Sequence, residues 1–421
     1  MNNDNQLNSN PSSLNENRTG QQHVFRNMTI KCDRIVTSTG ILNGAMTIVD
    51  GVIAEFVASP VEKWDLDLTG YILYPGLIDT HNHGNCGFSL REPIETREKR
   101  TKEIQCYLEN LSVFGITGVF PTCSIENISC VEEVSHQETV GAQILGIHVE
   151  GPWLKRAGEK GKAAAYPQPD HMTAEKMVED GKGMLKLVAL SPEIEQIEEI
   201  ADTISKHNVK LALAHTSCTC KEAQASLERF GFQTVTHVGN AMSGIHHRDV
   251  GTLGAVLLNK NLHCEIVCDF VHFCPEMVQL ILELKGFDHL MMVSDNSHYT
   301  GLPKGKYILP GGYIESDGMA KLTTDTGKIQ GSNCFVHEGF KNLALKLNVP
   351  LEELWKITSY NACRHYGIPN RGKLEVGYAA DFIVLNDQLD VLKTVTNGNL
   401  TYEKGAKQLI YNMDFIEKNR L

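Results

Sequence analysis

The sequence predicts an α/β protein: a (β/α)8 TIM-type barrel with a small β-sandwich domain built from both chain ends. Eight short apolar runs recur through the middle of the chain, helix-like stretches separate most of them, and both ends alternate apolar and polar residues. Short runs rich in Val, Ile and Leu are typical of strands that are buried on both faces. Eight such β-α repeats are what a closed barrel requires.

The eight runs are the predicted barrel strands. A doubly wound open sheet is the alternative, but no Gly-rich phosphate loop follows the first strand, which counts against it. Predicted helices include 96–115, 193–208, 221–231 and 274–286, several of which end in Gly, as helix C-termini often do. The predicted strands are GLIDTHNH (76–83), GVFPTC (118–123), QILGIHVEG (143–151), LKLVALSP (185–192), VKLALAHT (209–216), TVTHVGNA (234–241), HCEIVCD (263–269) and LMMVSDN (290–296).

Both ends of the chain have the pattern of β-strands around tight turns. Asp50-Gly51 lies between two alternating segments and is a strong signal for a two-residue hairpin. Segments 373–387 and 391–402 have the same character. The first residues are polar, rich in Asn and Ser, and unable to bury enough apolar surface to fold. The predicted organisation is a disordered leader (1–22), a first sandwich part (23–74), the barrel (75–370) and a second sandwich part (371–421).

Composition argues against several classes of protein. The formal net charge of −12 argues against a nucleic-acid binder, whose surface would carry a basic stripe. No run of about 18 apolar residues occurs, so no membrane-spanning helix is predicted. The 12 cysteines include no C-x-x-C pair, and no signal peptide is recognisable. Reduced thiols in the cytoplasm are the simpler interpretation, and we expect a cytoplasmic protein.

Polar residues end five of the predicted strands. In a barrel the middles of the strands are apolar, while catalytic groups come from their C-terminal ends. Strand one ends in His81 and His83, which share a face because they are two residues apart. The other strand-end residues are His148 and Glu150 of strand three, His215 of strand five, His237 of strand six and Asp295 of strand eight.

Taken alone, each of these residues has an ordinary structural explanation. A single His at a strand end is more often hydrogen-bonded than metal-bound, a Glu before Gly-Pro is usually a loop residue, and Asp295 could cap a turn. Together they are harder to dismiss, because a barrel brings its strand ends within a few ångströms. Imidazole and carboxylate ligands without thiolates suit Zn²⁺, Fe²⁺, Mn²⁺ or Co²⁺. We expect a divalent metal ion, with zinc as the first candidate.

A catalytic metal site needs about three protein ligands and an open position for water. Glu150, His215 and His237 supply three. The pKa of the bound water falls toward neutrality, and Asp295 is placed to take its proton. The predicted chemistry is metal-assisted hydrolysis.

A set of motifs resembles the amidohydrolase superfamily, and within it the N-acetylglucosamine-6-phosphate deacetylases. The likeness runs from about residue 26 to the C-terminus and includes GKLEVGYAADFIVLN, which is typical of the superfamily's β-sandwich. Strand four carries no lysine at its end, so the carbamylated-lysine dimetal centre of dihydroorotases and hydantoinases is not available. The motifs are PGLIDTHNHG, which is widely shared, and GIHVEGPWL, AHTSCT, THVGNAM and SDNSHYTGLPKGKY.

The resemblance implies roles for individual residues. Glu150, His215 and His237 match the family's metal ligands. Asp295 matches the acid/base that would take a proton from the metal-bound water and deliver it to the leaving amine. The implied reaction is deacetylation of N-acetylglucosamine 6-phosphate, or a closely related N-acetylhexosamine 6-phosphate, to amino-sugar phosphate and acetate. Residues that match substrate-binding positions are Asn240, the backbone at Ala241, the phosphate-binding Arg248 and His272.

Some features of this resemblance stay open. His81 and His83 permit a second metal ion, with Glu150 able to bridge, because some family members hold two ions there and others one. The alternative is that both histidines only hydrogen-bond around a single ion. We favour metal binding by both, and expect one or two ions per subunit. Structural alternatives remain for Asn240, which could only cap a turn, and for Arg248, which could only pair with Asp249. Relatives are commonly homodimers, so we expect a homodimer, in which Arg248 serves its own site or its neighbour's.

One loop departs from the family pattern. After GPWL the family usually carries a histidine that contacts the substrate near the reacting carbonyl, and the aligned place falls at about Ala163. The loop after strand eight instead carries His298 and Tyr299. Our hypothesis is that His298 partly replaces the absent group, or that the pocket accepts a different N-acyl sugar or amide, such as N-acetylgalactosamine 6-phosphate. A catalytically inactive, ligand-sensing relative is a third candidate, but a binding module has no use for the retained ligands and Asp295.

Overall fold

The computed structural model covers the predicted barrel and both β-rich ends. The predicted disordered leader, 1–22, lies outside the described residues. The described residues are 25–138, 140–157, 162–163, 166–309, 312–318, 322–324, 332 and 334–421.

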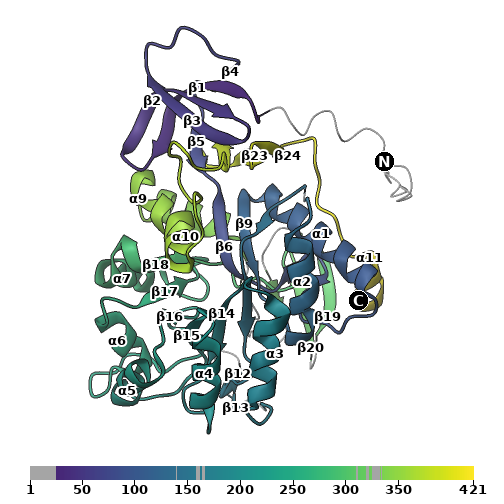
Figure 1. Cartoon of the computed structure of the whole chain (residues 1–421), viewed down its shortest axis with the longest axis vertical. Coiled ribbons are helices and arrows are strands. Elements are labelled where there is room, and N and C mark those ends of the chain that lie inside the picture. The colour runs from purple at the N-terminus through teal and green to yellow at the C-terminus, as the bar shows by residue number, and fades with distance from the viewer. Residues whose placement is uncertain are drawn as a thin grey trace, which may run out of the picture.

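Eight parallel strands form the barrel, one in each of the eight predicted runs. Two parallel sheets share these strands. Isolated bridges from Thr122 to His148 and from Asn82 to Asn296 join the two sheets and close the ring. The predicted (β/α)8 barrel is therefore confirmed (Figure 1). In barrel order the strands are β6 (Leu77–Asn82), β9 (Ile116–Pro121), β11 (Ile147–Glu150), β14 (Leu185–Leu190), β15 (Lys210–Leu213), β16 (Thr234–Val235), β17 (His263–Ile266) and β18 (Leu290–Met292), with the short β10 (Gln143–Ile144) beside β9.

Helices connect the barrel strands, and local signals set their ends. In the helix after β15, the Thr219 side chain accepts from the Glu222 backbone while the Glu222 side chain accepts from the Thr219 backbone, and Gly231 ends the helix at φ 65. The helices are α1 (Arg97–Val113), α2 (Ile128–Ser135), α3 (His171–Gly181), α4 (Ile197–Ser205), α5 (Cys220–Phe230), α6 (Gly251–Leu258) and α7 (Pro275–Lys285), then α8 (Val336–Lys341), α9 (Leu351–Trp355) and α10 (Asn361–Tyr366) after β18.

The two chain ends build one mixed sheet, as predicted. Asp50 and Gly51, at φ 51 and φ 79, form the predicted hairpin turn, because this turn needs positive φ at both positions. The two edges of this sheet approach each other around an apolar core that both chain ends share. Val52, at the start of β3, forms a bridge to Ala379, a few residues before the C-terminal strands. Its strands are β1 (Met28–Thr37), β2 (Gly40–Val49), β3 (Val52–Ala58), β4 (Leu66–Asp67) and β5 (Ile72–Pro75), with β22 (Phe382–Leu385), β23 (Val391–Thr396) and β24 (Asn399–Glu403).

The last residues leave this sheet and return to the barrel. Helix α11 (Met413–Asn419) lies beside α1 in Figure 1, and Asp414 pairs with Lys99 of α1 at 3.1 Å. The Asn412 backbone N–H donates to the carbonyl of Cys86, in the loop after β6. The predicted sandwich range 371–421 therefore supplies β22 to β24, while its end covers the side of the barrel. A smaller sheet, β19 (Gly305–Leu309), β20 (Gly312–Ser316) and β21 (Leu322–Thr324), lies nearby.

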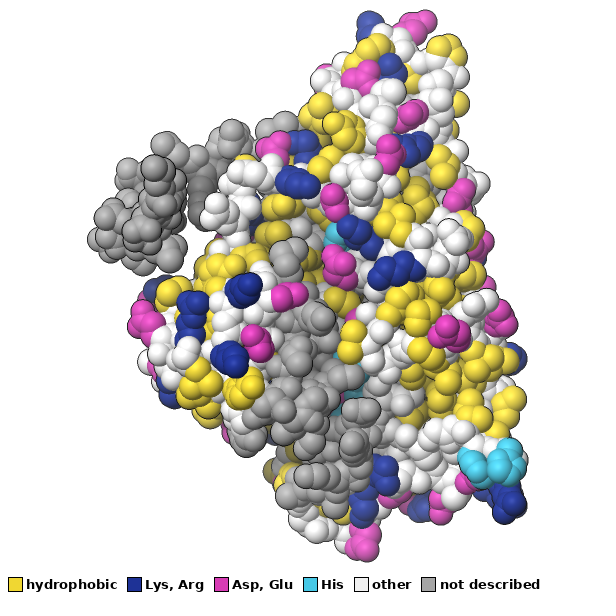
Figure 2. All heavy atoms as spheres, turned by 180° about the vertical axis from the view of Figure 1, so that it is seen from behind, with side chains coloured by type: hydrophobic (Ala, Val, Ile, Leu, Met, Phe, Trp, Pro, Cys, Tyr) yellow, Lys and Arg dark blue, Asp and Glu magenta, His cyan; other side chains and the backbone are white. Residues whose placement is uncertain are grey.

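The face in Figure 2 carries acidic and basic side chains interspersed among apolar ones, without one continuous basic surface among its described side chains. This distribution agrees with the net charge of −12. No helix in the described ranges has both the length and the apolar composition needed to cross a membrane.

The core of the mixed sheet makes a testable contribution to stability. Phe382 is fully buried and its ring meets that of Phe25 edge-on at 5.9 Å. We expect Phe382→Ala to lower the free energy of unfolding by about 3–5 kcal/mol, because the change removes buried apolar contacts and leaves a cavity. Urea unfolding measures this difference. Val57→Ala is the matched control, since Val57 of β3 is 39% exposed, and equal effects of the two changes would contradict the expectation.

Candidate metal centre

Three side chains from the ends of β11, β15 and β16 meet at the C-terminal mouth of the barrel. Glu150 ends β11, and His215 and His237 follow β15 and β16. The Nε2 atoms of His215 and His237 lie 3.0 and 3.1 Å from Glu150 Oε1, and 3.2 Å from each other. The structure thus brings the three predicted ligands together with their donor atoms converging on one point.

A second group lies directly beside the first. The Nε2 atoms of His81 and His83 are 3.1 Å apart, and each lies 3.4 Å from Asp295 Oδ1. Glu150 faces both groups, since His83 Nε2 lies 3.4 Å from Glu150 Oε2 and His81 Nε2 lies 3.7 Å from Glu150 Oε1. The position of Glu150 between the groups is what a bridging carboxylate requires.

The backbone is strained where these residues leave their strands. His215, His237 and Asp295 have φ values of 48, 29 and 53, in the left-handed region that L-residues rarely adopt. Such strain persists where the surrounding structure enforces it, and it clusters at functional sites. The turn at each position aims the side chain across the mouth of the barrel.

The electrostatics of the centre favour a cation. Burial lowers the pKa of His81, but the nearby charges of Asp295 and Glu265 outweigh it and raise that pKa to about 10. Burial raises the pKa of Glu150, but hydrogen bonds from His215 and His237 bring it well below its usual range. Three carboxylates therefore surround His81, and positive charge in their midst is stabilised.

The donor set fits a divalent ion. Two imidazole nitrogens 3.2 Å apart beside a carboxylate oxygen form the arrangement that one cation would hold together, and the His81 and His83 pair repeats it. His215 donates its Nδ1–H to the carbonyl of Arg156 at 2.8 Å, so in the neutral ring the Nε2 lone pair faces the centre. Metal-binding histidines are usually held in this way. The side chains concerned include no thiolate, which suits Zn²⁺, Fe²⁺, Mn²⁺ or Co²⁺.

The predicted substrate-binding residues lie at different distances from this centre. Asn240 N–H donates to the His237 carbonyl at 2.9 Å, and Ala241 follows at φ 51, so both belong to the turn after β16. The Asn240 side-chain nitrogen is buried without a hydrogen-bond partner among the described residues. His272 follows β17 and its Nδ1 lies 2.7 Å from Asp269 Oδ2. Arg248 is exposed, and no contact in the described structure joins it to the centre.

The loop that carries Ala163 touches the centre through its backbone. Arg156–Ala157 (β12) and Lys162–Ala163 (β13) form a short antiparallel hairpin in which Ala163 pairs with Arg156. Because the Arg156 carbonyl accepts from His215, the hairpin supports a metal-ligand candidate directly. Ala163 is therefore one strand pairing away from the residue whose carbonyl contacts His215.

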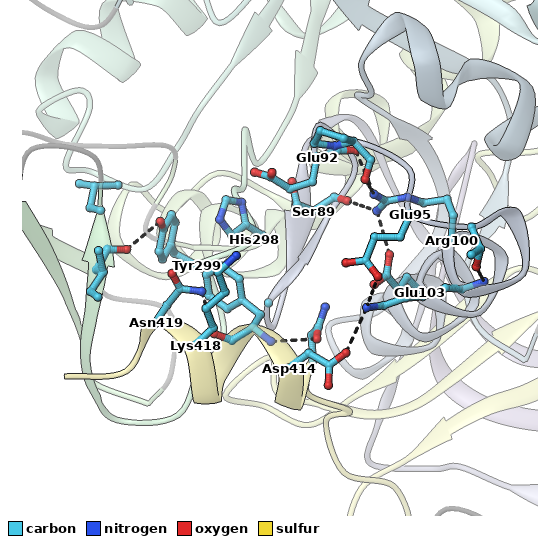
Figure 3. A pocket seen from close by; sticks show the side chains of 18 residues that line it. Ser89, Glu92, Glu95, Arg100, Glu103, His298, Tyr299, Asp414, Lys418 and Asn419 are labelled. Atoms are coloured by element: carbon cyan, nitrogen blue, oxygen red, sulfur yellow. Dashed lines mark hydrogen bonds and ion pairs between the residues drawn. The ribbon is translucent and has the colours of Figure 1, made fainter.

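His298, whose ring senses the charge of His83, lines a cavity of about 740 Å³. Its ring lies beside that of Tyr299 (Figure 3) and packs edge-on against Phe415 of α11. Burial and the charge of His83 lower the pKa of His298 to about 4, so the ring is neutral near pH 7. In this cavity Lys99 pairs with Glu95 at 2.9 Å and with Asp414 at 3.1 Å, and its described lining includes none of the metal-ligand candidates.

Sequence reasoning missed three residues of this region. Glu265 lies inside the apolar strand β17, Asp79 precedes the H-x-H pair, and Arg91 sits in a loop. Arg91 donates to Glu150 Oε2 at 2.7 Å, and Asp79 accepts from Ser294 Oγ at 2.6 Å. A charged residue within an apolar run was the available signal for Glu265 and Asp79, whereas nothing in the sequence marks Arg91.

The fold and the centre together define a class of protein: TIM-type barrels with a histidine and carboxylate site for divalent metal at the C-terminal mouth. A model of the amidohydrolase family matches residues 72–401 of this chain. The chain belongs to the amidohydrolase family.

Relatives of known activity match nearly the full length. The N-acetylglucosamine-6-phosphate deacetylase of Bacillus subtilis (strain 168) is 28% identical over 405 residues, which cover 92% of this chain and 100% of the relative. The N-acetylgalactosamine-6-phosphate deacetylase of Escherichia coli O157:H7 is 25% identical over 384 residues, 88% of this chain and 98% of the relative. The crystal structure of N-acetylglucosamine-6-phosphate deacetylase from Pasteurella multocida matches with a TM-score of 0.78 at 24% identity, covering 88% of this chain and 98% of that one.

Removing a ligand should remove metal. We expect purified protein to contain a divalent ion, and His237→Asn to lower its metal content because one of three converging donors is lost. Elemental analysis after gel filtration measures ions per chain. His207→Asn is the matched control, since His207 is about half exposed and its Nε2 faces Glu175 at 3.8 Å. Wild-type metal content in the His237 variant would rule out this ligand assignment.

Proposed function

We propose that the protein is a metal-dependent deacetylase that converts N-acetylglucosamine 6-phosphate, or a closely related N-acetylhexosamine 6-phosphate, to the amino-sugar phosphate and acetate. The observation that carries this proposal is the convergence of Glu150, His215 and His237 beside Asp295 at the barrel mouth. The deacetylases reported above support it, because they match this chain over nearly its whole length.

Asp295 is the acid/base in this proposal. When bound, a divalent ion lowers the pKa of water toward neutrality and polarises a carbonyl oxygen. Burial raises the pKa of Asp295, but the charge of His81 and the hydrogen bond from His83 lower it well below its usual range. Asp295 is thus a carboxylate that can accept a proton from the attacking water and return it to the leaving amine.

Asn240, Ala241, His272 and Arg248 bind the substrate in this proposal. The buried side-chain nitrogen of Asn240 is a donor without a protein partner among the described residues, and a ligand oxygen would satisfy it. The exposed guanidinium of Arg248 suits a phosphate group geometrically. The Asp249 carboxylate accepts from the backbone N–H groups of Gly251 and Cys220 at 3.0 and 3.1 Å.

The finer properties follow from the donor set and the resemblance. We propose zinc as the ion, with iron, manganese and cobalt as the other candidates that these ligands suit. We further propose a cytoplasmic homodimer, in which Arg248 serves its own site or its neighbour's. Sedimentation analysis of the purified chain tests the dimer.

The second candidate function is deacetylation of N-acetylgalactosamine 6-phosphate by the same metal centre. The relative with that activity supports it, as does the departure at Ala163, which pairs with Arg156 beside the metal centre. The two sugars differ in the orientation of one hydroxyl group, and loops such as this one carry that kind of discrimination.

Acetate release by metal-analysed protein tests both substrates. We expect turnover of at least one of the two sugar phosphates, and a loss of about 100-fold or more in Asp295→Asn, because the amide cannot take the proton. An exposed change, Glu98→Gln, is the control. If metal-bound protein released no acetate from either sugar phosphate, the proposal would be contradicted, and other N-acyl compounds should be tested.

The role of His298 can be tested separately. If His298 replaces the family's missing loop histidine, His298→Ala should lower turnover by about tenfold to 100-fold, since the substrate carbonyl loses a positioning group. His298→Phe keeps the ring packed on Phe415 but removes both nitrogens, and it should lose turnover as well. The exposed His136→Ala is the control. Wild-type turnover in both His298 variants would show that His298 does not replace the missing loop histidine.

A further inference from the structure

Glu265 is a fully buried carboxylate on an otherwise apolar barrel strand. Its neighbours on β17, Cys264 and Ile266, are both buried at 0% exposure, as is Glu265 itself. A carboxylate in such surroundings is costly unless hydrogen bonds compensate it. Two are present: His81 Nδ1 lies 3.0 Å from Oε2, and Thr80 Oγ1 donates to Oε1 at 3.3 Å.

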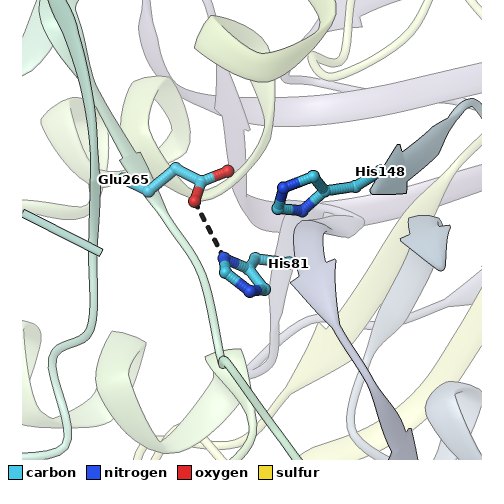
Figure 4. A group of neighbouring side chains, drawn as sticks. All are labelled: His81, His148 and Glu265. Atoms are coloured by element: carbon cyan, nitrogen blue, oxygen red, sulfur yellow. Dashed lines mark hydrogen bonds and ion pairs between the residues drawn. The ribbon is translucent and has the colours of Figure 1, made fainter. Parts of the chain in front are cut away.

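These contacts join two barrel strands that have only β18 between them. Glu265 extends from β17 toward His81 at the end of β6, with His148 of β11 beside them (Figure 4). The His148 ring meets the His81 ring edge-on, with centroids 4.5 Å apart. His81 therefore has a carboxylate at one nitrogen and a ring packed on its side, which together leave it little freedom to turn.

The hydrogen bond determines which nitrogen of His81 faces the metal centre. A carboxylate oxygen accepts, so Nδ1 carries the proton in this contact. In the neutral ring Nε2 then presents a lone pair, and it lies 3.1 Å from His83 Nε2 and 3.4 Å from Asp295 Oδ1. His215 repeats the arrangement with the Arg156 carbonyl in place of a carboxylate.

We propose that Glu265 is a positioning residue that orients His81, through the Nδ1–H to Oε2 hydrogen bond, so that the His81–His83 pair holds a second divalent ion beside the one held by Glu150, His215 and His237. The inference rests on the proposed function for its chemistry, and it adds a residue to which neither the motifs nor the family resemblance gave a role. Glu265 does not touch substrate in this scheme; it acts through His81.

The geometry also allows a second role for Glu265, as a metal ligand. Donor atoms of His81, His148 and Glu265 lie within 4.8 Å of one another, so the three could themselves bind an ion. That use would require His81 Nδ1 to lose the proton it donates at 3.0 Å. The short hydrogen bond favours the positioning role, and the number of bound ions distinguishes the two.

Metal content per chain tests the proposal. We expect about two ions in the wild-type protein and about one in Glu265→Met, which fills the space but cannot accept from His81. His81→Asn should lose the same ion, and its number of ions per chain is the reference for loss of that site. Glu265→Gln keeps an acceptor oxygen for Nδ1–H, so it should retain both ions, with the affinity of one weakened about 10-fold to 100-fold in competition with a chelator.

Glu132→Gln is the matched control, because Glu132 is also a buried carboxylate but its partners are Lys182 and His136, outside the centre. Its metal content should equal that of the wild type. Partial rescue by Glu265→Gln separates positioning from a purely structural role, since loss of packing alone would affect both ions. If Glu265→Met does not fold, the selective weakening of one ion in Glu265→Gln still decides the matter.

Three outcomes would overturn the proposal. They are two ions of wild-type affinity in Glu265→Met, one ion in the wild-type protein, or a third ion that is lost when either Glu265 or His148 is changed. None of these measurements uses a substrate. Failure of the deacetylase assay with normal ion counts would therefore overturn the proposed function and leave the role of Glu265 intact.

Discussion

The contact on which the centre depends is the one between Asp79 and Ser294, which joins the first barrel strand to the segment after the last. The Asp79 carboxylate accepts from Ser294 Oγ at 2.6 Å, from Ser294 N–H at 3.1 Å and from Asn82 Nδ2 at 3.0 Å. Asn82 in turn forms the bridge to Asn296 that closes the ring. Burial raises the pKa of Asp79, and the hydrogen bonds from Ser294 and Asn82 act in the opposite direction. These donors therefore stabilise the charged form of the buried carboxylate.

This closure sets the distance between residues that lie far apart in the chain. Asp295 directly follows Ser294, and its N–H donates to the His81 carbonyl at 2.8 Å. The H-x-H pair and Asp295 therefore stay in register, although more than two hundred residues separate them in the sequence. Around them, strained turns at His215 and His237 aim the remaining donors at Glu150. A barrel makes such a centre rigid because every ligand candidate leaves a strand of the same closed ring.

The centre is organised in two layers of polar groups. The inner layer is the set of nitrogen and oxygen atoms that converge at the mouth, and the outer layer fixes which way the rings face. The Arg156 carbonyl holds His215, and Glu265 holds His81. The hairpin that carries Arg156 also holds Ala163, which pairs with Arg156. This hairpin is therefore tied to the centre through the hydrogen bond between Arg156 and His215.

The sequence by itself determined the eight strands, the shared sheet of the two ends and the strand-end residues, because these follow from local periodicity and from the rule that parallel strands expose their C-terminal ends together. The Asp50-Gly51 hairpin was predictable for the same local reason. Only the tertiary structure decided the contacts across the barrel. Glu265 meets His81 from the second strand along the ring, and α11 returns to the barrel beside α1, at sequence separations that no local pattern encodes.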